Sequence, residues 1–290
     1  MELIIRSNHM QEVEGITAEY PYVLNRVSGA DTRVPWHWHE EVEFSLVVKG
    51  RLRVSVSGYS RVIEAGEGFY INSNILHTME PVDPDEEVLW NSYMFHSVFL
   101  GGHYKSVFDT KYMSPVLQNR KYELASFRGE SEDQCRILQL LQEAAQQQDL
   151  ADSEFRIRNI FSEIWLLLIR VLAQLEQSEQ LVKPVSQERI QIMLSYIHQH
   201  YPEKIALEEI AASAIVSKRE CLRCFQTCIQ KTPFEYLLDY RIRMAEKLLR
   251  TTALPVTQIA IQTGFSNSAY FTKVFRQLRG VAPGQYRRGI

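Results

Sequence analysis

The sequence lacks the features that mark membrane and secreted proteins. No run approaches the ~18 consecutive apolar residues of a membrane span, and the N-terminal segment reaches Arg6 too early to hold the apolar core of a signal peptide. Four cysteines among 290 residues, three of them between positions 221 and 228, do not form the framework of a secreted disulfide scaffold. Hydrophobic residues at 45% and charged residues at 23% are typical of a globular chain. We therefore expect a cytoplasmic protein with no membrane partner, and the length favours two domains.

Acidic residues are missing from one end of the chain. No Asp or Glu follows Glu246, whereas seven Lys and Arg do. Residues 1–183 hold 17 Lys and Arg against 27 Asp and Glu, a net charge of −10, and residues 184–290 hold 15 against 8, a net charge of +7. The overall charge of −3 hides this difference. Such an asymmetry indicates that the basic half has nucleic acid or an acidic surface as its partner.

Short hydrophobic runs alternate with turn residues through residues 1–100. The runs are rich in β-branched and aromatic residues, and glycines interrupt them. This pattern predicts an all-β sandwich or barrel, which we place in residues 1–130. The strands that stand out cover residues 42–48, 52–56, 69–71 and 88–95.

The hydrophobic period changes after residue 130. Apolar residues recur three and four positions apart, which predicts helices over residues 131–148 and 153–177. The second helix carries a long apolar stripe, which either covers the barrel or packs against a partner helix. Because the stripe is so long, we favour the partner helix and assign residues 131–180 to dimerisation. The stripe consists of Phe161, Ile164, Trp165, Leu168, Leu172 and Leu175.

A polar segment around Pro184 indicates a linker, placed at residues 181–186. Residues 187–290 then form a wholly helical domain by pattern. Pro233 and Pro283 suit the first turn of a helix, and Ser217 and Asn267 suit the N-cap position. The helices expected there cover residues 187–200, 207–214, 217–229, 233–250, 256–263, 267–279 and 283–288.

Two segments of this helical region repeat one plan. Residues 207–229 and 256–278 each read as a short helix, a tight turn and a second helix, and they align at an offset of 49–50 residues. Gly264 stands where the turn of the second copy requires a positive φ. The pattern predicts two helix-turn-helix units, a motif whose second helix enters the major groove of DNA.

Helical spacing divides each of the two second helices into an inner and an outer face. The inner residues are Cys221, Cys224, Phe225 and Cys228 in the first helix, and Phe271, Val274, Phe275 and Leu278 in the second. An outward arginine can bond guanine, and a small outward residue can meet a thymine methyl group. Outward Lys and Arg are otherwise ordinary surface, but two such helices in a basic region favour DNA. The predicted DNA-binding residues are Lys218, Arg219, Leu222, Arg223, Asn267, Ser268, Ala269, Thr272 and Lys273.

The cysteines and two histidines of the helical region are expected to have structural roles and no binding function. The thiols of Cys221, Cys224 and Cys228 have no fourth ligand nearby in the sequence, so we expect them to be buried as small hydrophobic side chains. His198 and His200 are expected at the surface, where a helix C-terminus favours their positive charge.

The C-terminal residues resemble a known family. The pattern Gly264-Phe265-x5-Phe271-x3-Phe275-x4-Gly280-x2-Pro283-x2-Tyr286-Arg287 is similar to the signature of the AraC/XylS family of bacterial transcription regulators, over about residues 187–288. The resemblance implies two helix-turn-helix units that enter successive major grooves and are joined by a long helix, here residues 233–250. Leu222 departs from the family, because polar residues are common at that outward position.

The N-terminal half also carries a resemblance. His37-x-His39-x3-Glu43-x6-Gly50 and Gly66-x5-Asn72-x-Asn74-x2-His77 resemble the two motifs of the cupin barrel, with Asn72 and Asn74 at positions where Pro and Gly are usual. His37, His39 and Glu43 share one parity, so we expect them on the same face of one strand, with His77 joining from a neighbouring strand.

Three interpretations of this polar group remain open. It can be a site for Zn²⁺, Fe²⁺, Mn²⁺ or Ni²⁺, a metal-free pocket for a small molecule, or a solvated strand face. We favour the metal-free pocket, where Trp36, Trp38 and Tyr70 can stack on a sugar ring. The predicted ligand-binding residues are His37, His39, Glu43, His77, Trp36, Trp38 and Tyr70, and the first four are also the candidate metal ligands.

The sequence thus predicts an α+β multidomain protein, with a cupin-like β-barrel and helical hairpin followed by an all-α domain of two helix-turn-helix units. We expect a bacterial transcriptional regulator, not an enzyme, that responds to a small molecule such as a sugar. The expected partners are double-stranded DNA, a carbohydrate-like effector and a second copy of the chain, with RNA polymerase as a further candidate. The one candidate cofactor is a divalent metal in the barrel. The alternatives are a metal-dependent cupin enzyme fused to a DNA-binding domain and a constitutive regulator whose barrel only dimerises.

Overall fold

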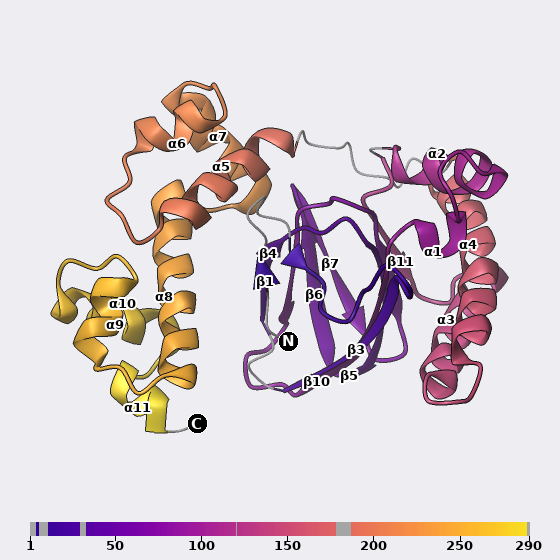
Figure 1. Cartoon of the computed structure of the whole chain (residues 1–290), viewed down its shortest axis with the longest axis horizontal. Helices are drawn as coiled ribbons and strands as arrows, with labels where there is room; N and C mark the ends of the chain where they lie inside the picture. The colour runs from indigo at the N-terminus through magenta and orange to yellow at the C-terminus, as the bar shows by residue number, and fades with distance from the viewer. Residues whose placement is uncertain (1–3, 6–10, 30–32, 120, 178–186, 289–290) are drawn as a thin grey trace. The chain divides into compact units, whose positions relative to one another are not determined.

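The computed structural model describes residues 4–5, 11–29, 33–119, 121–177 and 187–288. The chain divides into two compact units, Met1–Val185 and Ser186–Ile290 (Figure 1). The linker expected at residues 181–186 lies outside the described residues. Among the residues that are described, no helix is long and apolar enough to cross a membrane.

The N-terminal unit is built on two antiparallel sheets. The five-stranded sheet has the order β11-β8-β5-β10-β3 and the four-stranded sheet the order β4-β9-β6-β7, with a separate pair β1-β2. Several strands escaped the sequence analysis, because they are short or carry few alternating apolar residues. The strands are β1 (Ile4–Ile5), β2 (Gln11–Glu12), β3 (Tyr22–Gly29), β4 (Val34–His37), β5 (Val42–Lys49), β6 (Arg51–Val56), β7 (Tyr59–Glu64), β8 (Gly68–Ile71), β9 (His77–Pro81), β10 (Val88–Phe95) and β11 (Leu124–Phe127).

The space between the two sheets is the first hydrophobic core. It takes Val47, Phe69 and Trp90 from the five-stranded sheet, and Leu52 and Met79 from the four-stranded sheet, all at 2% exposure or less. Because strand residues alternate between faces, the neighbours of these residues on the five-stranded sheet point outward to a second core.

Two helices, α3 (Glu132–Gln147) and α4 (Ser153–Gln177), cover that outer face (Figure 1). Phe161 and Trp165 of α4 pack edge-on against the ring of Phe44, at centroid distances of 5.8 and 6.4 Å. The apolar stripe of α4 is therefore buried against the sheet of its own chain. The interpretation of this stripe as a surface for a partner helix is wrong, because its side chains are already covered.

Residues 98–117 form helical turns that the sequence analysis did not predict: α1 (Val98–Gly101), η1 (Asp109–Met113) and α2 (Ser114–Leu117). They pack against α4, where the indole of Trp165 donates to the carbonyl of Tyr112 at 3.0 Å. Each of these elements is too short to show a helical period in sequence.

The C-terminal unit is wholly helical in its described part, as predicted. Ser217, Thr232 and Asn267 each cap a helix by accepting a backbone N–H with the side-chain oxygen. The cupin-like β domain followed by a helical helix-turn-helix domain confirms the predicted fold class. The helices are α5 (Glu188–His200), α6 (Leu207–Ser213), α7 (Lys218–Ile229), α8 (Pro233–Thr251), α9 (Val256–Gln262), α10 (Ser268–Arg279) and α11 (Pro283–Arg288).

Candidate DNA interface and buried histidine cluster

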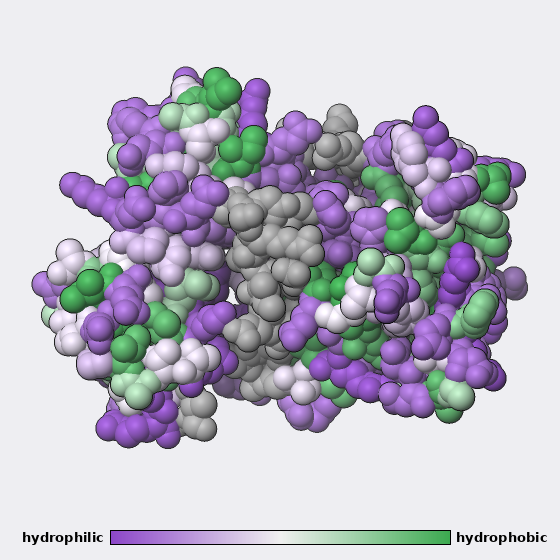
Figure 2. Space-filling model, viewed as in Figure 1, coloured by the Kyte–Doolittle hydropathy of each residue, from purple (hydrophilic) through white to green (hydrophobic). Residues whose placement is uncertain are grey.

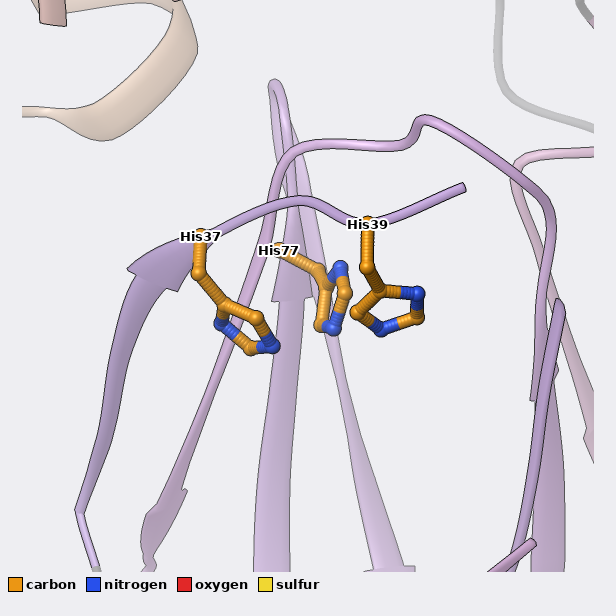
Figure 3. Close-up of side chains that lie close together, drawn as sticks. All are labelled: His37, His39 and His77. Carbon is orange, nitrogen blue, oxygen red and sulfur yellow. The ribbon is translucent and has the colours of Figure 1, made fainter. Parts of the chain in front are cut away.

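Three histidines meet inside the N-terminal unit. His37, at the end of β4, lies opposite His77 of β9, and their ring centroids are 4.0 Å apart. The ring of His39 lies 5.1 Å from that of His77. One ligand atom from each imidazole lies within 4.8 Å of the others, and all three side chains point toward one another (Figure 3). The three histidines that were grouped from the sequence therefore lie together in the structure.

These side chains do not meet through shared parity on one strand, as predicted, but through a crossing of the chain between the two sheets. His37, His39 and Glu43 do not lie on one strand, because β4 ends at His37 and Glu43 belongs to β5 of the other sheet. The chain crosses between the two sheets at residues 38–41, and the three side chains converge from both. Shared parity along a single strand is thus not what brings them together.

Each imidazole is oriented by a backbone carbonyl close to it in sequence. The Nδ1 atoms of His37, His39 and His77 lie 2.7, 2.9 and 2.7 Å from the carbonyl oxygens of Pro35, Glu41 and Ile75. A carbonyl only accepts, so each Nδ1 carries the proton. The Nε2 atom of a neutral ring then presents a lone pair, which is the arrangement that metal-binding histidines adopt.

Glu43 faces these Nε2 atoms. Its Oε2 lies 3.6 Å from Nε2 of His39 and 3.5 Å from Nε2 of His77, which is too long for an ordinary hydrogen bond. Its Oε1 accepts from the hydroxyls of Ser45 at 2.9 Å and Ser92 at 2.7 Å. Neither serine was predicted from the sequence. Ser45 shares the inward parity of Glu43, whereas Ser92 is brought opposite Ser45 only by strand pairing.

The cluster is almost completely buried, and this shifts its pKa values. Burial and the neighbouring imidazoles lower the pKa of His37 well below its usual range, and burial also lowers that of His77. At His39 the effect of burial is outweighed by the Glu43 carboxylate, which raises the pKa. The two imidazoles likewise outweigh burial at Glu43 and lower the pKa of its carboxyl. Glu43 is therefore a carboxylate, and the cluster can receive a cation.

Of the three aromatic residues predicted to line a ligand pocket, one lies on the opposite face of the sheet. Tyr70 is fully buried on the outer face of the sheet, 5.1 Å from the Phe44 ring and 6.1 Å from that of Trp165. The structure thus contradicts the placement of Tyr70 beside the histidines, since position 70 has the outward parity of β8. Trp36 is half-buried and adjoins His37 in β4, and Trp38 is buried at 5% exposure.

The first helix-turn-helix unit comprises α6 and α7. Cys221, Phe225 and Cys228 are buried and Cys224 is half-buried, so the predicted inner face is confirmed. The predicted outward residues are all exposed, and Leu222 is 42% exposed. Gln226, which the sequence analysis did not single out, is exposed on the same face one turn beyond Leu222.

The second unit comprises α9 and α10. Phe271, Val274 and Phe275 are buried as predicted, but Leu278 is 37% exposed, so its inward assignment is wrong. Leu278 lies in the last turn of α10, beyond the core cluster, whose α10 members end at Phe275. Arg276, which the sequence analysis missed as a candidate, is exposed one turn beyond Thr272. Asn267, Ser268, Ala269 and Lys273 are exposed and Thr272 is half-buried.

Several of the predicted DNA-binding side chains have partners within the protein. Lys218 donates to Glu208 at 2.6 Å, and Arg223 is bound by Glu220. The Asn267 side chain accepts from the backbone N–H groups of Ala269 and Tyr270 at 2.8 and 3.3 Å. Hydrophilic side chains predominate on the face of the C-terminal unit shown in Figure 2.

Arg241 of α8 joins the segment between α5 and α6 to the turn of the second helix-turn-helix unit. It donates to the carbonyl oxygens of Tyr201 at 2.7 Å and Glu203 at 2.6 Å, just beyond α5, and lies 5.8 Å from the Phe265 ring. Gly264, in the turn of the second unit, has φ +85°, as predicted, and a Cβ there would lie 2.5 Å from the carbonyl oxygen of Tyr201. Glycine thus permits both the turn and this close approach.

His198 is buried, contrary to the prediction. Its Nε2 lies 2.6 Å from the hydroxyl of Tyr236, and its ring stacks on Tyr240 at 4.2 Å and 14°. Both partners lie on α8, so no local signal in α5 reveals the burial. His200 is at the helix end and lies 3.3 Å from the carboxylate of Glu203.

Comparisons with known proteins agree with both halves of this description. Residues 210–289 match the model of a helix-turn-helix domain, and residues 26–92 match that of a cupin domain. The HTH-type transcriptional regulator YdeC of Bacillus subtilis is 28% identical over 98% of both chains. The probable transcriptional regulator LumQ of Photobacterium leiognathi is 24% identical over 90% of this chain and 95% of its own. The chain therefore contains an AraC-type helix-turn-helix domain and a cupin domain, and these two relatives, which match it over at least nine-tenths of its length, are named as transcriptional regulators.

Solved structures similar to this chain include ToxT of Vibrio cholerae. It has a TM-score of 0.49 at 15% identity, and the match covers 92% of this chain and 98% of that one. An AraC-type regulator from Chromobacterium violaceum is 27% identical with a TM-score of 0.35, over 36% of this chain and 92% of that one. The AraC-type helix-turn-helix domain assigns DNA as the partner of the C-terminal unit.

Proposed function

We propose that this regulator reads a specific DNA sequence with α7 and α10 and that its barrel senses a small molecule. The observation that carries the DNA half is the repeated pair of helices, each with a buried inner face and an exposed outer face. The exposed faces carry Arg219, Arg223, Lys273 and Arg276. Bidentate arginine contacts distinguish guanine from other bases in the major groove.

A selection from random duplex DNA with the full chain tests sequence-specific reading. We expect Arg223→Ala to weaken binding to the selected duplex by about 1–3 kcal/mol and to relax the preference at one position. Arg51→Ala, an exposed arginine of the barrel, is the matched control and should leave the preference intact. Unchanged preference in Arg223→Ala would remove α7 as a reading helix.

The sensing half of the proposal rests on the histidine cluster. Burying a carboxylate and three imidazoles costs free energy unless their polar atoms have binding partners. The Nε2 atoms of His39 and His77 are buried without a hydrogen-bond partner, and the donor set of three nitrogens and one carboxylate oxygen suits a divalent transition metal. His37, His39, His77 and Glu43 would hold that cation, which would supply a Lewis acid for an oxygen atom of the effector.

For the effector we propose a polar metabolite rich in oxygen, such as a sugar. A hydroxyl group suits both states of the site, because its oxygen can bind a cation and its O–H can donate to the free Nε2 of an imidazole, whereas a carboxylate group suits the bound cation. With Tyr70 excluded, stacking on the effector falls to Trp36 and Trp38 alone. Calorimetry of the full chain against a panel of sugars and sugar acids tests this, and no response to any of them would count against it.

Elemental analysis of the purified chain tests the metal. We expect a bound divalent metal that His39→Ala removes, whereas His103→Ala, which changes an exposed histidine outside the cluster, should retain it. A metal-free protein that still responds to its effector would favour the pocket without metal.

Two rival functions give different results. A cupin enzyme fused to a DNA-binding domain needs turnover of its ligand, and we propose instead that the ligand leaves the barrel unchanged. A constitutive regulator, whose barrel only dimerises, would bind DNA equally well with and without every effector. Product analysis after incubation with the ligand identifies the first rival, and DNA affinity measured with and without the ligand identifies the second.

We further propose that the regulator acts as a homodimer through the outer side of the α3–α4 hairpin. Phe155 and Leu166 of α4 are 71% and 49% exposed. Residues 11 apart share a face of an α-helix, so these two apolar side chains lie on one exposed stripe. Effector binding would change how the two DNA-binding units are presented, and RNA polymerase is the further partner that such a change would reach.

A further inference from the structure

The first recognition helix contains an ion pair next to its DNA-reading face. The carboxylate of Glu220 accepts from the guanidinium of Arg223 twice, with Nε at 2.8 Å from Oε2 and Nη2 at 2.6 Å from Oε1. The side chain of Arg223 remains 69% exposed, whereas that of Glu220 is 24% exposed. A bidentate pair of this kind fixes the plane of the guanidinium group.

The two hydrogen bonds use only one edge of the guanidinium group. Arginine has five N–H donors in a rigid fork, and Glu220 takes the edge formed by Nε and Nη2. The edge formed by Nη1 and Nη2 is directed away from the carboxylate. Two parallel N–H groups of this kind match O6 and N7 of guanine.

Glu220 also has contacts with Ser217 and with Arg189 of α5. Its backbone N–H donates to the capping hydroxyl of Ser217 at 3.2 Å, and Nη1 of Arg189, on α5, lies 3.4 Å from its Oε1. The hydrogen bonds from Arg223 lower the pKa of Glu220, so it is ionised near neutral pH. Glu220 thus connects the exposed arginine to the rest of the unit.

We propose that Glu220 is a specificity-determining residue, which holds Arg223 in the orientation that reads guanine. The inference rests on the proposed role of α7 in DNA reading. A fork fixed in advance loses little side-chain freedom on binding guanine. A contact from Arg223 to phosphate would instead bring the Glu220 carboxylate toward the negatively charged backbone, which disfavours binding to unrelated sequences.

Comparing Glu220→Gln with the wild type tests this role, because glutamine keeps the shape and removes the charge. The full chain is used to select a duplex from random DNA, and affinities are then measured for that duplex, for a version with one guanine pair replaced, and for unrelated DNA. We expect Glu220→Gln to reduce discrimination at one guanine by about tenfold and to bind unrelated DNA more tightly. Arg223→Lys, which keeps the charge but loses the fork, should lose the same discrimination.

A double substitution shows whether the two residues act together. In an Arg223→Ala background, Glu220→Gln should cause no further loss of discrimination, because the residue that it positions is gone. Arg189→Gln leaves the Glu220–Arg223 pair in place and should preserve the guanine preference. Thermal unfolding of each variant separates these effects from a loss of folded protein.

Three results would overturn the inference. One is full discrimination retained by Glu220→Gln. Another is an equal gain in affinity for selected and unrelated DNA, which would make Glu220 only a repelling charge. The third is that the wild-type chain selects no sequence at all, in which case the proposed function itself fails.

Discussion

Ile215 occupies in the first helix-turn-helix unit the position that Gly264 occupies in the second. Both residues have a positive φ, +54° and +85°, and both donate their N–H to the carbonyl three residues earlier, at 3.0 Å. The residues after them, Val216 and Phe265, close the same turn. A β-branched residue rarely adopts this conformation, so the first turn is strained where the second is relaxed.

The strain predicts that Ile215→Gly stabilises the C-terminal unit. The left-handed conformation costs a non-glycine residue about 1–2 kcal/mol, whereas the added freedom of glycine in the unfolded chain costs about 0.4–1 kcal/mol. The side chain is 95% exposed, so its removal loses little packing. We expect a gain of about 0.5–1 kcal/mol, seen as a higher midpoint of the C-terminal transition in scanning calorimetry. A lower midpoint would mean that the isoleucine makes a stabilising contact.

The opposite substitution, Gly264→Ala, should destabilise the unit. Its Cβ would lie 2.5 Å from the carbonyl oxygen of Tyr201 and 2.8 Å from Nε of Arg241, in addition to the cost of the positive φ. We expect a loss of about 2–4 kcal/mol. Gly280→Ala is the matched control, because its φ is +77° but no atom lies within 4 Å of the added Cβ. Equal losses in the two variants would show that the contact with Tyr201 is unimportant.

The exposed basic side chains of α10 predict how the affinity for DNA depends on salt concentration. Lys273 and Arg276 are exposed in the region that has no acidic residue. Lys273→Ala should weaken binding to all sequences alike and reduce the slope of log K against log salt by about one. Fluorescence anisotropy at several salt concentrations measures the slope. Lys49→Ala, in the barrel, should leave it unchanged, and a loss confined to one sequence would assign Lys273 to base reading instead.

The exposed apolar side chains of Phe155 and Leu166 on α4 predict the site of dimerisation. Leu166→Glu places a charge at an exposed apolar position and should shift the chain toward monomer in sedimentation velocity. The control is Leu150→Glu, because Leu150 is 52% exposed but lies in the turn between α3 and α4. A dimer that persists in Leu166→Glu would place the interface elsewhere.

The serines behind Glu43 predict a change in metal affinity. Ser92→Ala removes one of the two hydroxyls that hold Oε1, at 2.7 Å. We expect the affinity for Zn²⁺ to fall about 10–100-fold in a calorimetric titration, as is usual when a group that orients a ligand is lost. Ser57→Ala changes another buried serine, whose hydroxyl has no hydrogen-bond partner, and should have no effect. Equal affinities in all three proteins would argue against a cation at Glu43.

Local sequence patterns predicted the parts of this structure that depend on local interactions. The caps at Ser217 and Asn267 and the positive φ of Gly264 each follow from the chemistry of a few adjacent residues. The two-residue spacing of His37 and His39 likewise identified the polar cluster, although for a reason that the crossing between sheets corrects. The conformation of Ile215 contradicts its own preference, because the repeated turn imposes it.

The errors arose where a distant partner decides the outcome. The buried apolar stripe of α4 was predicted to pack against a helix of another chain, because nothing in residues 153–177 reveals the sheet that covers it. His198 is buried by tyrosines some forty residues away. Tyr70 faces α4 because β8 pairs with β5 and β11 in one register, which periodicity alone does not give.

The bonds of Arg241 have a consequence for the length of the operator. They join the segment that leads into the first helix-turn-helix unit to the turn of the second, so we expect a single chain to keep one separation between α7 and α10. An extra base pair between the two sequences that they read would rotate one of them by about 34–36° around the duplex. The protein cannot follow that rotation without breaking these bonds. Insertion of a single base pair should therefore reduce binding as strongly as a change in the bases themselves.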